Sequence, residues 1–495
     1  MSRLTGAGEQ RGAEVIDEHG DTVPLPMIPS DGDPQEPLDH GQEPDPQRPP
    51  LAPILKKVAL GLAVCLVAGA GYAGLQHIAN APADPNAPGA HQPPSATPST
   101  PDQAQAGVQR AVAGEAVLQK MADAVAHDDR TEFLNAIDPK TPAFRTSART
   151  IFSNLSALPL GTFQLRYVSD DEGALTPDRQ AQLGGTQSWL AQVEVSWQLS
   201  GFDVTPARET LPVTFVTRDG KTYAASFSER FAAGQRRPVW AFGAIEIAKG
   251  EHSLVVSLDA GSDAKSEARS YVSVADKAVE SVSKVWGKKW RQKVIIFLPA
   301  KQAQMEGILG AKPNTYTQIA AVTMAELDTP AVGAPVRIVA NPKLFEELGK
   351  QGRRIVLTHE TTHVASNATA SPVPLWLAEG FADYVAFTAV PVQDDSAAKE
   401  LFKAVHAGHV PAGLPTPEAF AASATELPQA YESAWLACRL IAEREGQDKL
   451  VAFYRAVHAS KSSTGLADAF KSVLGMTEAE FVVQWQKYLE RLAGD

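Results

Sequence analysis

Cysteine is scarce in this chain, and its scarcity excludes a disulfide-built scaffold. Only 2 of the 495 residues are Cys: Cys65 lies within an apolar run, and Cys438 lies far downstream in a helix-like segment. An intrachain disulfide between them is therefore not expected. Stability has to come from hydrophobic cores, and a hydrophobic content of 44% provides material for two or three domains.

Aromatic residues are almost missing from the first 107 positions, which excludes a packed core there. Tyr72 is the only aromatic in this stretch, which also holds 17 of the 36 prolines. Residues 1–50 carry 11 acidic and 3 basic side chains, a net charge of −8 out of −12 for the whole chain. We therefore expect residues 1–53 to be a disordered acidic, Pro-rich tail. The acidic balance also argues against a nucleic-acid-binding protein.

Charge is absent between Lys57 and Gln76, where 18 uncharged and mostly apolar residues follow one another. This length is close to the about 20 residues that a transmembrane helix needs. A cleaved signal peptide is the alternative, but its basic start would stand at the chain terminus, and here more than fifty residues come first. Residues 54–76 are therefore predicted to be a single membrane anchor.

Basic residues flank this run on one side only. Arg48, Lys56 and Lys57 precede it, and no Lys or Arg follows until Arg110. This asymmetry predicts a cytoplasmic N-terminus and extracytoplasmic C-terminal domains at the cell membrane. The Pro-rich residues 77–107 are predicted to be an extended stalk.

The periodicity of apolar residues changes within residues 108–248. Helical spacing at the start gives way to the alternation typical of strands. Strands are predicted at 163–170, 188–199, 208–219, 221–229 and 238–248. They indicate an α+β domain with a curved antiparallel sheet, which resembles the nuclear-transport-factor-like cone of exported bacterial proteins. No cluster of His, Asp or Glu points to chemistry here, so a spacer or partner-binding role is favoured over catalysis.

Residues 249–495 follow a different pattern, a small sheet and then helices. A long helix is predicted at 264–285, and strands at 252–258, 293–299, 318–324 and 336–342. Asn341 before Pro342 is typical of a helix start, and Thr477 with Glu480 predicts a capping box for the last helix. The fold class expected is therefore α+β, with two exported domains.

His359, Glu360 and His363 form an HExxH motif in RRIVLTHETTHVA, a segment with helical character. A spacing of four residues places both imidazoles on one face of a helix, where they can bind one metal ion with Glu360 beside them. The competing interpretation is a pair of solvent-exposed histidines. A correctly placed third ligand would favour a zinc site of the hydrolase type.

Glu379 is the strongest candidate for that ligand. It lies in PLWLAEGFADYVA, sixteen residues after His363, and completes the set of two His and one carboxylate that catalytic zinc uses. Asp383, on the same helical face, is expected to accept a hydrogen bond from a metal-bound imidazole, or to be the ligand if Glu379 is not. Ser366 and Thr369 stand where metzincins require Gly and His, which excludes that class.

Three segments in this order, VLTHETTHVA, PLWLAEGFADYVA and QAYESAWLACRLIAEREGQDKLVAFY, resemble the gluzincin clan of zinc metallopeptidases, specifically the peptidase MA-like group of exported actinobacterial proteins. The resemblance implies zinc held by His359, His363 and Glu379. It also implies peptide-bond hydrolysis by a zinc-activated water, with Glu360 as general base. Gluzincins use a Tyr or His from a later helix to donate to the carbonyl oxygen, and Tyr431 is the candidate.

These observations predict a membrane-anchored, extracytoplasmic zinc metallopeptidase of residues 249–495, acting on a peptide or protein substrate. The alternative is a catalytically inactive peptidase-fold surface protein that binds partners or acts as a scaffold through residues 108–248. An inert descendant would be free to lose Glu360, which is present with all the candidate ligands. Self-cleavage of the stalk stays open, and the sequence indicates neither the cleavage specificity nor the oligomeric state.

Overall fold

The computed structural model describes residues 15–16, 22–23 and 101–494, except for 172, 228–234, 259–260, 262, 326–332, 422–423 and 461. The chain separates into two compact units, residues 1–49 and 50–495. Of the first unit, strands β1 (Val15–Ile16) and β2 (Thr22–Val23) are described, and they pair antiparallel.

Several predictions concern residues outside this description. The acidic tail, apart from β1 and β2, lies outside the described residues, and so do the membrane anchor (54–76) and most of the stalk. Among the helices that are described, none has the length and apolar content to cross a membrane. Helix α3 (Pro101–Ala126) begins within the predicted stalk, with proline at its first position, where the missing N–H is tolerated.

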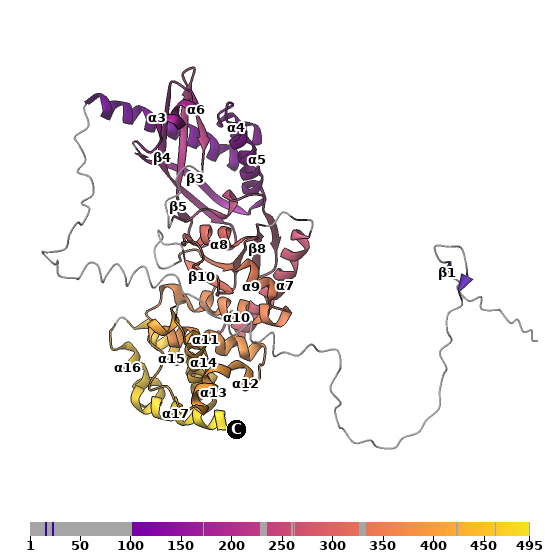
Figure 1. Ribbon diagram of the computed structural model, residues 1–495, viewed down its shortest axis with the longest axis vertical. Helices are drawn as coiled ribbons and strands as arrows, with labels where there is room; N and C mark the ends of the chain where they lie inside the picture. The colour runs from indigo at the N-terminus through magenta and orange to yellow at the C-terminus, as the bar shows by residue number, and fades with distance from the viewer. Residues whose placement is uncertain are drawn as a thin grey trace, which may run out of the picture. The chain divides into compact units, whose positions relative to one another are not determined.

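A four-stranded antiparallel meander, ordered β3-β4-β5-β6, is the first sheet of the second unit (Figure 1). Helix α3 packs against its strands β3 and β6. Alternate side chains of β4 from Val193 to Leu199 are buried, which places one face of the sheet in the core. Its strands and remaining helices are β3 (Leu160–Asp171), β4 (Gln187–Leu199), β5 (Ala207–Arg218), β6 (Lys221–Ser226), α4 (Arg130–Asn135), α5 (Pro142–Ala157) and α6 (Pro177–Leu183).

The prediction of a fifth strand at 238–248 in this sheet is wrong. Residues Val239–Ala241 form the 3-10 helix η1, and the carbonyl groups of Trp240 and Gly243 accept hydrogen bonds from the Asn154 side chain, at 2.9 and 2.6 Å, in place of a strand partner. The later residues form β7 (Glu246–Lys249), which pairs with β8 in the second sheet. The predicted domain boundary between 248 and 249 therefore falls inside β7.

The second sheet has the order β10-β11-β9-β8-β7. Strands β8, β9 and β11 run parallel, and the edge strands β7 and β10 run antiparallel to their neighbours. The long helix α7 (Ala264–Trp286) is the crossover between β8 and β9. The remaining bounds are β8 (Ser253–Ser257), β9 (Val294–Leu298), α8 (Gln302–Leu309), β10 (Ala321–Ala325) and β11 (Val336–Ala340). All four strands predicted from 252 onward are present.

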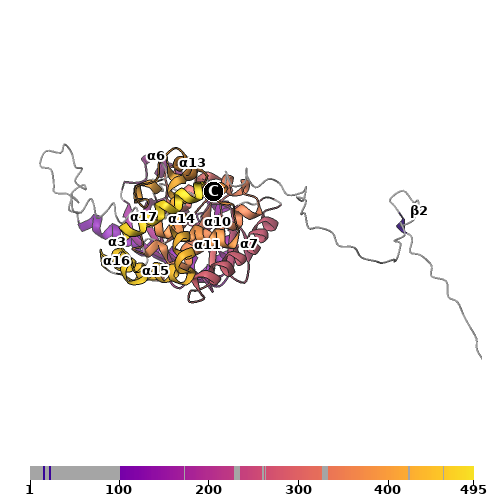
Figure 2. The ribbon, with the colours of Figure 1, turned by 90° about the horizontal axis from the view of Figure 1, so that it is seen from below.

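Helices follow the second sheet to the end of the chain. Asn341 caps the first of them by accepting from the N–H groups of Lys343 and Leu344, as predicted. The Thr477–Glu480 capping box also forms. The helices are α9 (Pro342–Glu347), α10 (Lys350–Ser366), α11 (Leu375–Ala389), α12 (Asp394–Ala397), α13 (Lys399–His406), α14 (Leu427–Glu445), α15 (Gln447–Ala459), α16 (Gly465–Ala469) and α17 (Glu478–Gly494). Helix α11 packs between α10 and α14 (Figure 2).

One buried ion pair joins the two sheets. Arg337 in β11 donates from Nη1 and Nη2 to the two carboxylate oxygens of Asp203, at 2.6 and 2.9 Å. Asp203 follows β4, and the guanidinium lies 5.4 Å from the centroid of the Trp197 ring in that strand. Both charged side chains are 1% exposed or less, so this contact is part of the core that the two sheets share. The chain is thus an α+β protein, as predicted.

Candidate metal centre

The HExxH motif lies in the middle of α10, as its helical character predicts. From Ile355 to His363 every residue of this helix is buried, so the motif belongs to the interior of the protein. The helix ends where Asn367 takes a left-handed conformation, with φ 52°, a position that Asn tolerates better than most residues. The competing interpretation of solvent-exposed histidines is wrong, because His359 and His363 are each 0% exposed.

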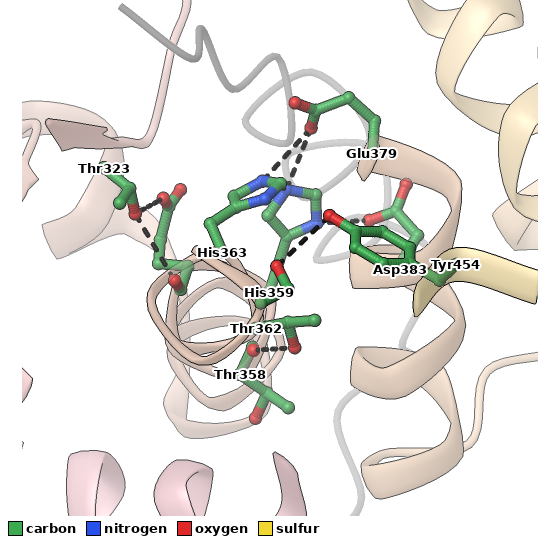
Figure 3. Close-up of polar contacts among 10 residues, drawn as sticks. Thr323, Thr358, His359, Thr362, His363, Glu379, Asp383 and Tyr454 are labelled. Atoms are coloured by element: carbon green, nitrogen blue, oxygen red, sulfur yellow. Dashed lines mark hydrogen bonds and ion pairs between the residues drawn. The ribbon is translucent and has the colours of Figure 1, made fainter. Parts of the chain in front are cut away.

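Helix α11 brings Glu379 to the two histidines. The residue after it, Gly380, allows α11 to lie directly against α14: a Cβ built at this position would stand 2.2 Å from the carbonyl oxygen of Ala434. Any side chain here would push the two helices apart. Glu379 itself is 1% exposed, and it points from α11 toward the imidazoles (Figure 3). The close packing of α11 and α14 therefore sets the position of this carboxylate.

Three potential ligand atoms converge at this point (Figure 3). The Nε2 atoms of His359 and His363 are 3.0 Å apart, and Oε2 of Glu379 lies 3.1 Å from the first and 3.4 Å from the second. Two zinc ligands at bond lengths of about 2.0–2.2 Å and a tetrahedral angle lie about 3.3–3.6 Å apart. The measured separations are close to this range, so the three side chains could hold one metal ion.

Asp383 orients one of the histidines. Its Oδ1 lies 2.7 Å from Nδ1 of His359, and its side chain is 3% exposed. A neutral His359 that donates from Nδ1 keeps the lone pair of Nε2 available, on the side where Glu379 lies. Nδ1 of His363, in contrast, has no hydrogen-bond partner within the described part of the chain. Asp383 thus lies behind His359, in contact with the ring nitrogen that faces away from Glu379.

The two oxygens of Glu360 have different surroundings. Oε2 accepts a hydrogen bond of 2.5 Å from the hydroxyl of Thr323 in strand β10, whereas Oε1 is buried and has no partner among the described residues. Sequence reasoning missed Thr323. The only signal for it was the prediction of a strand at 318–324, and nothing in that pattern indicates which helix the strand would face.

Burial and the histidines act in opposite directions on the carboxylates. Burial raises the pKa of Glu360 and of Asp383 above the usual values. Burial also acts on Glu379, but His363 and His359 outweigh it and hold the pKa of Glu379 below its usual value. Burial alone would lower the pKa of His359, yet Asp383 and Glu379 raise it to about 10. Three carboxylates around two imidazoles give the pocket an acidic character that suits a cation.

Tyr431, the predicted donor to substrate, is part of the core of the helical half. Tyr431 lies in α14, 4% exposed, with its ring edge-to-face on Phe420 at 5.1 Å between centroids. A second tyrosine that sequence reasoning passed over, Tyr454 in α15, contacts the helix of the motif: its hydroxyl donates to Oγ of Ser366, one turn after His363 in α10, at 3.2 Å. The role of Tyr431 as a donor to substrate stays a prediction.

Comparisons with known proteins add no relative to this description. No protein-family model matches the chain, and no curated protein matches it. The site is therefore defined by its own geometry: a buried group of two histidines and a glutamate that could hold a metal ion, with a second glutamate beside it.

Proposed function

We propose that the chain is a zinc-dependent metallopeptidase of the gluzincin type, with residues 249–495 as a zincin-like catalytic domain. The convergence of His359, His363 and Glu379, with separations of 3.0–3.4 Å between their nearest ligand atoms, is the observation that carries this proposal. Two nitrogen donors and one carboxylate are the set typical of catalytic zinc, which keeps a fourth position for water or substrate.

The chain's own groups divide the work of hydrolysis. Zinc, when bound, would polarise the substrate carbonyl and lower the pKa of a water toward neutrality. Oε1 of Glu360 is the oxygen left open to take a proton from that water, because Thr323 occupies Oε2. Glu360 would then return the proton to the amine that leaves. Asp383 would hold His359 in the tautomer that a metal ligand needs.

Strand β10 supports a proposal for how an extended substrate binds. Among the strands that the structure describes, it is the last of its sheet, and β11 is its neighbour. The same strand carries Thr323, which contacts Glu360. A peptide that pairs with β10 on the side away from β11 would lie beside the general base, as in other cases of β-strand addition.

We further propose that this peptidase is held at the outer face of a cell membrane. The uncharged run between Lys57 and Gln76, with basic residues on its N-terminal side only, supports an anchor and its orientation. Residues 108–248, whose order of helices and strands resembles the nuclear-transport-factor-like cone, would lie between the stalk and the catalytic domain.

The test compares zinc content and peptide hydrolysis of the full-length chain with three variants. We expect about one zinc per chain, loss of zinc and activity in His363→Ala, and retention of zinc in Glu360→Ala with activity about 10²–10⁴-fold lower. His409→Ala, at an exposed histidine outside the site, is the control and should match the wild type. A wild-type chain without zinc would contradict the proposal. One that binds zinc but hydrolyses no member of a peptide library would favour the scaffold alternative.

A further inference from the structure

The carboxylate of Glu360 is held from one side only. Its side chain is 0% exposed, Oε2 accepts from the Thr323 hydroxyl at 2.5 Å, and Oε1 has no partner in the described part of the chain. The hydroxyl also lies 3.3 Å from the backbone carbonyl oxygen of Glu360, but its contact with Oε2 is the shorter one, and it restricts the rotation of the carboxylate. It therefore decides which of the two oxygens remains available.

Thr323 is well placed to act in this way. It lies in β10, opposite Ile338 of β11, and it is 0% exposed. Its side chain is β-branched and therefore has few rotamers when buried. Near the end of the strand, the carbonyl of Ala325 accepts a hydrogen bond from Arg236 at 3.0 Å, which ties the strand to the first half of the unit. The hydroxyl is thus presented by a strand that both β11 and Arg236 hold in place.

We propose that Thr323 is a positioning residue for the general base: by occupying Oε2 it directs Oε1 of Glu360 toward the proton that has to be removed. This inference rests on the proposed function, and it adds a residue from outside the HExxH helix to the machinery. If the hydroxyl served only to satisfy a buried polar group, its loss would change stability and leave the turnover number as it was. Loss of the hydroxyl should therefore lower kcat if Thr323 positions the general base, and leave kcat unchanged if it only satisfies a buried polar group.

The experiment uses the full chain loaded with zinc and three variants. Thr323→Val keeps the shape and removes the donor, Thr323→Ser keeps the donor, and Thr214→Val removes another buried threonine hydroxyl, one that has no partner among the described residues. We expect kcat to fall about 10- to 100-fold in Thr323→Val, less than in Glu360→Ala, with KM changed by less than about threefold and zinc content unchanged. Thr323→Ser and Thr214→Val should stay within about threefold of the wild type.

A second readout needs no activity. A double-mutant cycle between Thr323→Val and Glu360→Ala, measured as unfolding equilibria of the zinc-free chain, should give a coupling of about tenfold in the equilibrium constant. A Thr323→Val chain that keeps kcat within twofold, or a cycle without coupling, overturns the positioning role and leaves the proposed function standing. A zinc-loaded wild type that hydrolyses no peptide overturns both.

Discussion

At the scale of single residues, the two histidines of the site are not equivalent. His359 has Asp383 behind it at 2.7 Å, whereas Nδ1 of His363 has no partner among the described residues. A carboxylate behind a ligand fixes its tautomer and raises its basicity. Asp383 should therefore act on metal affinity through His359 alone, without touching the ion.

The first prediction follows for Asp383→Ala. Without the carboxylate, His359 loses its fixed orientation, and zinc affinity should fall about 10- to 100-fold. Titration against a competing chelator measures it. Glu379→Ala should cause a larger loss, because it removes a ligand, and Asp394→Ala, at an acid paired with Arg439, is the control. A loss in Asp383→Ala greater than that in Glu379→Ala would mean that Asp383 is the third ligand.

At the scale of elements, the helices around the site hold one another through buried polar groups. Glu432 in α14 accepts hydrogen bonds from the backbone N–H groups of Leu401 and Glu400, at 2.6 and 3.4 Å, in the first turn of α13. It is 5% exposed, and burial raises its pKa from 4.5 to about 7 in spite of these bonds. The contact between α13 and α14 thus depends on a carboxylate that titrates near neutral pH.

The second prediction concerns stability and pH. Because the folded chain keeps a proton on Glu432 that the unfolded chain releases, this residue lowers the free energy of unfolding as pH rises from about 4.5 to about 7. The loss has an upper bound of about 3 kcal/mol. Glu432→Gln cannot ionise, so its stability should fall less than that of the wild type between pH 5 and pH 8 in denaturant titrations. Glu490→Gln, at an exposed position of α17, should behave as the wild type. Parallel pH profiles for all three chains would contradict this role.

At the scale of the whole molecule, the described part of the second unit is one body whose two sheets share a core. The pair of Arg337 and Asp203 lies within that core, where neither charge reaches solvent. A buried ion pair adds little net stability, but the loss of one partner leaves a charge without compensation. We therefore expect the pair to act chiefly by specifying how the sheets meet, and with it the position of β11 and of its neighbour β10.

The third prediction tests this contact. Asp203→Ala should lower the free energy of unfolding by about 3–5 kcal/mol, and the double substitution of Leu for Asp203 and Met for Arg337 should restore most of it. Glu194→Ala breaks the partly exposed pair with Arg166 on the first sheet. This substitution should lower the free energy of unfolding by about 0–1 kcal/mol. Denaturant unfolding measures all three. Equal effects of Asp203→Ala and Glu194→Ala would show that the buried pair does not join the sheets.

Much of the fold follows from local patterns. The alternation in β4, the Asn341-Pro342 helix start and the HExxH helix were all predictable, because each depends on residues within a few positions of one another. The structure of residues 238–248 was not predictable, because it depends on a distant residue. Asn154, more than eighty residues earlier, donates hydrogen bonds to carbonyl groups that would otherwise pair with a strand.

The sequence by itself determined that His359, Glu360 and His363 share one helix. Residues four positions apart lie on the same helical face, so the two imidazoles lie side by side. The sequence also indicated Glu379 and Asp383 as the residues that meet them. Only the tertiary structure decided that they do meet. The close approach of α11 to α14 at Gly380 and the position of β10 beside α10 are set by packing between distant segments. Thr323 stands 37 positions before Glu360, and no local period links the two. Packing alone brings that hydroxyl to the carboxylate.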